Sequence, residues 1–197
     1  MKNECVIFDF ETLSVDRVNG VVLSMAMLNY SEERFVSKPY KYDELIEKCS
    51  LIKFDVEKQV KNYKRTIDKD TLSWWNQQSD EAKKQLKPSA ADQDIGELYD
   101  FIFSNCSIKE VNKVFSRGNT FDPIFLDYIF RQCKQPDIFT HWTLRDTRSY
   151  IEGLSYGSNL KNSFIPEGLN ELFVAHDPSH DIVMDVMRMQ TLVQAIS

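Results

Sequence analysis

Two acidic side chains interrupt an apolar segment near the start of the chain, "CVIFDFETLS" over residues 5–14. The segment has the composition of a buried strand. Residues i and i+2 of a strand point to the same face, so we expect Asp9 and Glu11 side by side. Two neighbouring carboxylates are costly to bury unless a cation compensates them, and hard divalent cations prefer oxygen ligands. The pair predicts a metal site, although for so short a motif alone a strand that ends at Phe8, with both acids in solvent, is the more common explanation.

Further groups of the same kind occur more than a hundred residues later. Asp122 lies in "RGNTFDP", after a short apolar strand, and the C-terminal helix begins with "HDPSHDIVMD" over residues 176–185. In this order the motifs resemble those of the DnaQ-like, or DEDDh, exonucleases. Within that superfamily, "FDFET", "WW" followed by "QSDEAKK", "RGNTFDPIFLD", "RDTRS" and "FVAHDPSHD" are similar to the T-even phage exonucleases and their relatives.

The resemblance implies an α/β domain with a ribonuclease H-like fold. Its mixed five-stranded sheet would combine an antiparallel three-strand meander with two parallel strands, and helices would cover both faces. The resemblance also implies a 3′-to-5′ exonuclease that hydrolyses phosphodiester bonds and releases nucleoside monophosphates. The expected cofactors are two Mg²⁺ or Mn²⁺ ions, and the expected partners are 3′ ends of single-stranded nucleic acid, DNA more than RNA.

The residue types agree with this chemistry. Two ions held by carboxylates can bind the scissile phosphate, activate a water molecule and stabilise the departing oxygen. The resemblance implies that Asp9 binds both ions, that Glu11 and Asp185 complete one site, and that Asp122 supports the other. A histidine next to the attacking water can accept its proton, because the histidine pKa lies near neutral pH.

The last motif has two possible registers, His176 with Asp181 and His180 with Asp185. On a helix, Asp185 lies nearer than Asp181 to the edge of the apolar stripe that starts at Ile182, so it is better placed to reach carboxylates on the first strand. We therefore expect His180 and Asp185 to be the catalytic pair. Because Ile182 stands where the family has a small residue, the other register stays open.

The resemblance also suggests residues that contact the substrate. Thr12 and Leu13 follow the first two acids, at positions where the family meets the terminal nucleotide. Asn119 and Phe121 are expected to shape the pocket around Asp122, although Asn119 is equally well explained as a turn residue. Two aromatic side chains, Trp74 and Trp75, either stack on bases or lie partly in the core.

The pattern of apolar residues predicts where the elements lie. Strands are expected in "ECVIFDFETL", "VVLSMAMLNY" and "ERFVSKPY", followed by a helical and polar segment from residue 42 to about 86 that includes "TLSWWNQQSDEAKKQL". An amphipathic helix is expected in "QDIGELYDFIFSN" and a short strand over residues 114–116. Helices should begin at two Asp-Pro pairs, in "RGNTFDP" and in "AHDPSHD", and a short strand should run into a helix near Asp146.

Length and composition indicate one globular domain over residues 1–197, with 42% hydrophobic residues and a formal charge of −6. The four cysteines are widely spaced, which argues against a zinc site and a disulfide framework. No signal peptide or membrane span is recognisable. We therefore expect a cytoplasmic protein, in the host cytoplasm if it is a phage protein, with no membrane partner and no implied protein partner.

Two alternatives remain open from the sequence. One is a 3′-to-5′ exoribonuclease that acts on short RNA, because no residue visibly reads or excludes the 2′-hydroxyl. The other is a noncatalytic nucleic-acid-binding module that has kept the fold. Retention of every acidic residue of the pattern disfavours this second alternative.

Overall fold

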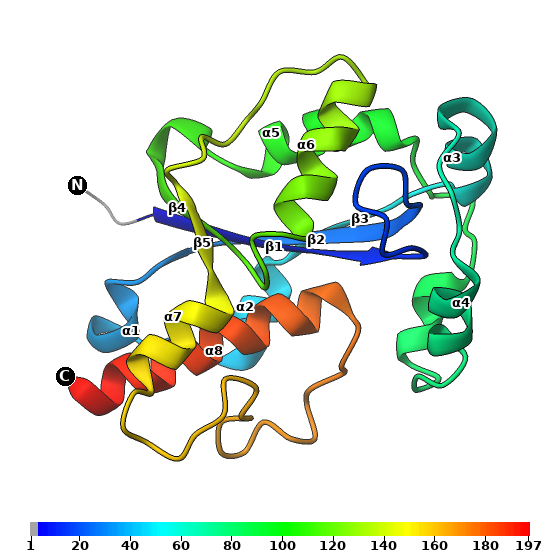
Figure 1. Cartoon of the computed structure of the whole chain (residues 1–197). Coiled ribbons are helices and arrows are strands. Elements are labelled where there is room, and N and C mark those ends of the chain that lie inside the picture. Colours follow the sequence, from blue (N-terminus) through cyan, green and yellow to red (C-terminus); the bar gives the residue numbers. More distant parts are fainter. Residues whose placement is uncertain (1–3) are drawn as a thin grey trace.

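The computed structural model describes residues 4–197, so the first three residues of the predicted 1–197 domain lie outside the described residues. A mixed five-stranded sheet in the order β3-β2-β1-β4-β5 forms the centre of the molecule (Figure 1). Its strands are β1 (Glu4–Thr12), β2 (Val22–Ser31), β3 (Ser50–Lys53), β4 (Val111–Ser116) and β5 (Leu144–Asp146). The first three strands are antiparallel, whereas β4 runs parallel to β1 and β5 parallel to β4. The predicted ribonuclease H-like sheet is confirmed.

Helices cover both faces of this sheet (Figure 1). On one face, α8 packs on β1 and β2 and contacts α1, α2 and α7, whereas α6 contacts β1 on the other face and α5 contacts β3. The α-helices are α1 (Arg34–Ser37), α2 (Tyr42–Lys48), α3 (Val56–Tyr63), α4 (Lys69–Trp75), α5 (Leu98–Asn105), α6 (Asp122–Gln132), α7 (Thr147–Leu154) and α8 (Pro178–Ile196). Three short 3₁₀ helices are η1 (Ala82–Leu86), η2 (Ile95–Glu97) and η3 (Ile108–Glu110). Within residues 4–197, no helix is long and apolar enough to cross a membrane.

The third strand of the meander is not where the sequence predicted it. Residues 33–40 contain the short helix α1, whose Phe35 is fully buried in the cluster under α8, while Val36 is 56% exposed. The strand that pairs with β2 is β3, inside the segment that was predicted to be helical. The prediction was wrong because Phe35 and Tyr40 pack under a helix from the other end of the chain, a contact that local alternation cannot reveal.

The predicted helical segment from residue 42 to 86 is divided into several elements. The Asp55 side chain accepts the Lys58 N–H and starts α3, and the left-handed conformation of Lys64 (φ 58°) ends it. The Asp68 side chain then caps α4. Aspartates with these local hydrogen bonds favour helix starts over helix interiors. The other predicted helices and short strands are confirmed, including both Asp-Pro starts, at α6 and α8.

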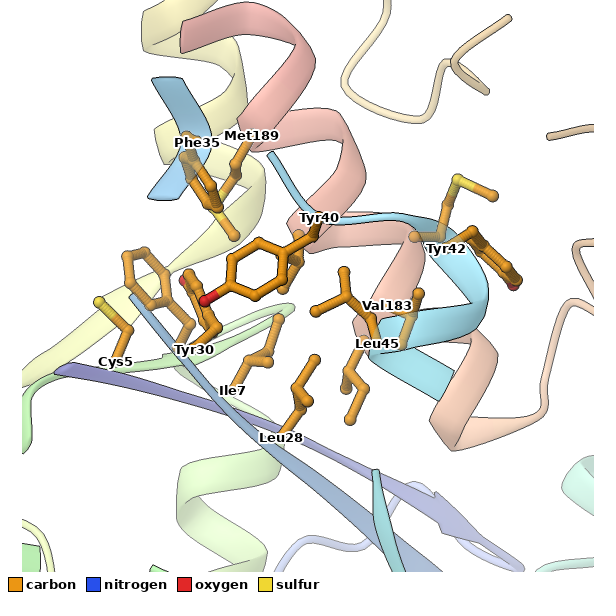
Figure 2. Packing of buried hydrophobic residues seen from close by; sticks show 14 of the residues in the cluster. Cys5, Ile7, Leu28, Tyr30, Phe35, Tyr40, Tyr42, Leu45, Val183 and Met189 are labelled. Atoms are coloured by element: carbon orange, nitrogen blue, oxygen red, sulfur yellow. The ribbon is translucent and has the colours of Figure 1, made fainter. Parts of the chain in front are cut away.

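Alternate residues of β1 face two different hydrophobic clusters. Cys5 and Ile7 pack with Tyr30, Phe35 and Tyr40 under α8, as Figure 2 shows. The next residues in that row of β1 are Asp9 and Glu11, so the alternation of the strand places both acids on the face that α8 covers. Val6, Phe8 and Phe10 point to the opposite face, where they pack against residues of α5 and α6.

A buried amide joins α3 to the sheet. The Gln59 Oε1 accepts the Val22 N–H at 3.0 Å, and Gln59 Nε2 donates to the Val22 carbonyl at 2.7 Å. We predict that Gln59→Ala lowers the free energy of unfolding by about 2 kcal/mol, because a buried N–H and C=O lose their partners. Urea unfolding measures this, with Gln77→Ala in the exposed turn after α4 as control. Equal stability of the two variants would contradict it.

Candidate active site

An open cavity of about 260 Å³ lies where the C-terminal ends of β1 and β4 meet α8. Ionisable side chains from four parts of the chain line it: Asp9, Glu11, Arg117, Asp122, His176, Asp181 and Asp185. The parallel pairing of β1 with β4 places the segments that follow each strand at the same edge of the sheet. This topology brings together acids that are far apart in the sequence.

Asp122 is held by the backbone of β1. Its Oδ1 accepts the Phe10 N–H at 3.2 Å, and its side chain does not cap α6. The turn before α6 depends on Gly118, whose φ of 118° is unfavourable for residues with a Cβ atom. Asp122 is only 2% exposed, and burial raises its pKa to about 7.

The carboxylates of this cavity raise one another's pKa. Burial is the largest cause for both Asp9 and Glu11, whose pKa values lie well above the ordinary range for carboxyl groups. Repulsion from Asp122 and Glu11 adds to the effect at Asp9, and repulsion from Asp181 and Asp122 adds to it at Glu11. A cation bound among these groups would offset their mutual repulsion, so such a cluster is a candidate metal site.

His176 and Asp181 belong to this cluster. One ligand atom from each of Glu11, His176 and Asp181 lies within 4.8 Å of the other two, which is a suitable spacing for a metal ion. The backbone N–H of His176 donates to Asp181 Oδ2 at 2.9 Å, and His176 adopts a left-handed conformation with φ of 64°. Burial raises the pKa of Asp181 to about 7, whereas burial lowers the pKa of His176.

The structure does not bring His180 to the carboxylates. His180 Nδ1 lies 2.8 Å from the Tyr42 hydroxyl and 3.4 Å from the Val174 backbone N, and His180 is not part of the cavity lining. The side chain therefore connects α2 to the segment that precedes α8. Of the two histidines considered from the sequence, the structure brings His176 to the cavity and leaves His180 outside it.

Asp185 lines the cavity, but its oxygens are occupied. Asp185 Oδ1 accepts from Arg117 Nη1 at 2.7 Å and from Arg188 Nη1 at 2.6 Å, and Oδ2 accepts from the Thr147 hydroxyl. The side chain is 1% exposed. Helical periodicity placed Asp185 nearer than Asp181 to the apolar stripe, and in this buried position Asp185 pairs with two arginines. The spacing of Asp185 and Arg188, three residues apart on one helix, could have indicated this ion pair from the sequence. The ion pair with Arg117 was not predicted.

The four residues predicted to contact the substrate do not lie in one pocket. Thr12 and Phe121 line a second pocket beside the carboxylates, together with Trp74. Leu13 is instead buried in a small cluster with Trp75. Asn119, named in the sequence prediction, lies in the β4–α6 turn, donates its N–H to Asp146 Oδ2 at 3.2 Å and faces a different cavity. The structure therefore does not bring Leu13 or Asn119 together with the other two.

Comparison with known proteins agrees with this arrangement. A family model described as the Rv2179c-like domain of 3′-5′ exoribonucleases matches residues 4–190. The chain belongs to this family. The exodeoxyribonuclease of Enterobacteria phage T4 is 29% identical to this exonuclease over 201 residues, which cover 93% of the chain and 86% of the phage protein. The predicted membership of the DnaQ-like exonucleases and the predicted 3′-5′ exonuclease class are both confirmed.

Solved structures of exonuclease I show the same fold. A zinc-bound complex of the E. coli enzyme with single-stranded DNA has a TM-score of 0.64 at 12% identity, and covers 98% of this chain. A product-bound exonuclease I structure has a TM-score of 0.59 at 14% identity and covers 100% of the chain. The Rv2179c-like exonuclease domain spans only 41% and 43% of those two chains.

The two aspartates of α8 should respond differently to substitution in this exonuclease. We predict that Asp181→Asn abolishes metal-dependent cleavage without loss of stability, because it removes one of several repelling carboxylates. Asp185→Asn should lower the free energy of unfolding by about 3 kcal/mol, because the buried Arg188 loses its counter-charge. Urea unfolding and nuclease assays measure both effects. A stable, inactive Asp185→Asn beside an active Asp181→Asn would instead support the His180 register.

The stability of the metal-free exonuclease should depend on pH. The pKa values of Asp122 and Asp181 rise from 3.8 to about 7 on folding, so the folded state binds more protons between these values. The free energy of unfolding should therefore fall as pH rises from about 4 to 8 in EDTA. Added Mg²⁺ should raise the melting temperature more at pH 8 than at pH 5, since it must compete with protons at the lower pH. Thermal unfolding tests this. A melting temperature that increases over the same pH range in EDTA would contradict it.

Proposed function

We propose that this chain, acting as one domain, removes nucleotides from the 3′ end of single-stranded DNA and releases nucleoside monophosphates. The observation that carries the proposal is the convergence of carboxylates from β1, α6 and α8 with an imidazole at one open cavity. Such a site has the donors that phosphodiester hydrolysis requires. A noncatalytic binding module is disfavoured, because it would retain the unfavourable burial of Asp9 and Asp122 without using it.

The cavity fits divalent metal ions, because its donors are carboxylate oxygens that raise one another's pKa. We propose that Asp9, Glu11, Asp122 and Asp181 hold two Mg²⁺ or Mn²⁺ ions. Asp181 replaces Asp185 in this assignment, because Asp185 is already neutralised by two arginines. When bound, the two ions polarise the phosphate and lower the pKa of a bound water molecule.

His176 is our proposed general base. Burial lowers its pKa, so the imidazole is mostly neutral near pH 7 and can accept the proton of a water that attacks the phosphate. Its backbone is held by Asp181, which fixes the segment next to the cluster. Arg117, oriented by Asp185, places a positive charge in the same cavity and favours a phosphate there.

The choice of DNA over RNA is supported by the relative from phage T4, whose name is exodeoxyribonuclease. Complexes of exonuclease I with a dA16 and a 5cy-dT13 oligonucleotide, on the same fold, agree with single-stranded DNA. The alternative, an exoribonuclease, is supported by the description of the family. We further infer that the enzyme works in the cytoplasm, which would be the host cytoplasm if the protein comes from a phage like its T4 relative.

Matched oligomers test the proposal. DNA and RNA strands of one sequence, labelled at the 5′ end, are incubated with Mg²⁺, Mn²⁺ or EDTA. We predict stepwise shortening of the DNA from its 3′ end with either ion and none with EDTA. Asp9→Ala should reduce the rate by about 10³-fold, equivalent to about 4 kcal/mol of lost charge stabilisation, while the protein stays folded.

Each other result has a definite meaning. A higher kcat/KM on RNA than on DNA would favour the exoribonuclease. Absence of metal-dependent cleavage of either polymer would favour the binding module. Full activity of Asp9→Ala would contradict the assignment of the site.

A further inference from the structure

A second pocket, which we call the α4 pocket, adjoins the carboxylate cavity. It has a volume of about 510 Å³ and lies between the end of β1 and helix α4, with Phe10, Thr12, Val15, Trp74 and Phe121 among its walls. Phe10, Glu11 and Phe121 line both spaces. The volume lies within the range of about 300–1,000 Å³ that is common for small-molecule sites.

The charges around the α4 pocket select the kind of group that fits it. Its walls are mostly apolar, and its polar lining includes the carboxylates of Glu11, Asp68 and Asp70. These acids disfavour a phosphate, whereas a planar, neutral base can rest against the aromatic and apolar walls. Because this pocket shares Phe10, Glu11 and Phe121 with the carboxylate cavity, a strand whose terminal phosphodiester lies among the carboxylates can reach the pocket with its terminal base.

Trp74 stands between the α4 pocket and the proposed general base. Its ring lies 4.7 Å from the His176 ring at 80°, an edge-to-face contact, and the residue is still 40% exposed. The neighbouring Trp75 is fully buried and donates Nε1–H to the Thr12 carbonyl at 2.9 Å. The two indoles also meet edge to face, 5.2 Å apart. Trp75 thus anchors α4 to β1, and Trp74 extends from that anchor to His176.

Within residues 4–197, no hydrogen bond to the ring nitrogens orients the His176 imidazole. The hydrogen bond to Asp181 holds the backbone N–H of His176, and leaves rotation of the imidazole to be limited by packing. The Trp74 indole is the aromatic wall on which that ring rests.

We propose that Trp74 is a positioning residue for His176, and that a base in the α4 pocket presses the indole into the orientation that aligns the imidazole. This inference rests on the proposed nuclease function. It makes hydrolysis depend on a properly seated terminal base, so an end without a base is cleaved slowly even though its phosphate can reach the carboxylates.

The test compares Trp74→Phe, Trp74→Leu and Leu72→Ala with the wild type. Leu72 is an exposed residue of α4 outside the α4 pocket and serves as the matched control. The substrate is whichever polymer the wild type cleaves, with a normal or an abasic 3′-terminal nucleotide. Melting temperatures check that each variant is folded.

Trp74→Leu keeps the pocket apolar but loses the ring edge, so kcat should fall about 10- to 100-fold with KM changed less than about threefold. Trp74→Phe should retain most of kcat, and Leu72→Ala should match the wild type. The abasic end should lower kcat of the wild type but have little further effect on Trp74→Leu, because both changes act through the same contact. Normal kcat of Trp74→Leu, or independent effects of the two changes, would overturn the proposal.

A binding measurement does not depend on turnover. Deoxyadenosine monophosphate should quench tryptophan fluorescence of the wild type, whereas deoxyribose 5-phosphate and the Trp74→Phe variant should give no quenching. Equal quenching of Trp74→Phe would overturn the placement of the base. Failure of the wild type to cleave either polymer would overturn the proposed function and the role of Trp74 together. Normal cleavage by Trp74→Leu would overturn only that role.

Discussion

Repulsion among the carboxylates at the end of β1 is the constraint on which the rest of this structure depends. Asp9 and Glu11 share one face of a strand, and Asp122 reaches the same place from α6. Burial raises the pKa of all three groups, and repulsion from neighbouring carboxylates adds to the effect at Asp9 and Glu11. The energy that holds them together comes from the packing of β1, whose two faces enter two separate hydrophobic clusters. A strand bonded on both edges, to β2 and to β4, is a rigid support for an arrangement that is unfavourable by itself.

The charge of Asp185, unlike that of the carboxylates at the end of β1, is compensated by neighbouring side chains. Asp185 is the most deeply buried acid of α8, and two guanidinium groups and a hydroxyl compensate it. The same arginines also hold the irregular segment before α8, since Arg117 donates to Asn162 Oδ1 at 3.1 Å and Arg188 donates to the Phe164 carbonyl at 2.6 Å. The compensated acid therefore organises the segment that carries His176. Asp181, one helical turn earlier in α8, faces Glu11 and His176 instead, where a bound cation would offset the like charges.

The residues around the N-terminus of α8 also differ in what they contact. Asp177 caps α8 by accepting the N–H groups of Ser179 and His180. His180 is hydrogen-bonded to the Tyr42 hydroxyl and to the Val174 backbone N–H. It therefore helps to position the segment before α8 but does not enter the cavity. His176, in a left-handed conformation, is turned toward Glu11 and Trp74. Two histidines four residues apart thus lie in different surroundings, because one precedes the helix and the other belongs to its first turn.

Much of the fold and part of the candidate site were determined by the sequence alone. The alternation of β1 predicted a shared face for Asp9 and Glu11, the two Asp-Pro pairs predicted the starts of α6 and α8, and the order of motifs predicted the mixed sheet and the nuclease family. These predictions succeeded because each rests on a local period, on a helix start or on chain order. The third strand was missed because Phe35 is buried by a helix distant in sequence.

The surroundings that distinguish the two registers of α8 arise only in the tertiary structure. Asp181 and Asp185 have the same spacing to a histidine and lie on the same helix, and their positions relative to the apolar stripe do not reveal their charge partners. What distinguishes them is that Arg117, from the end of β4, reaches Asp185 together with Arg188, while Asp181 faces Glu11 and His176. The same is true of Trp74 and Trp75, because only the docking of α4 on β1 determines which indole is buried and which one reaches the imidazole. A side chain's charge partners and neighbours depend on which distant segments pack around it, and sequence spacing does not carry that information.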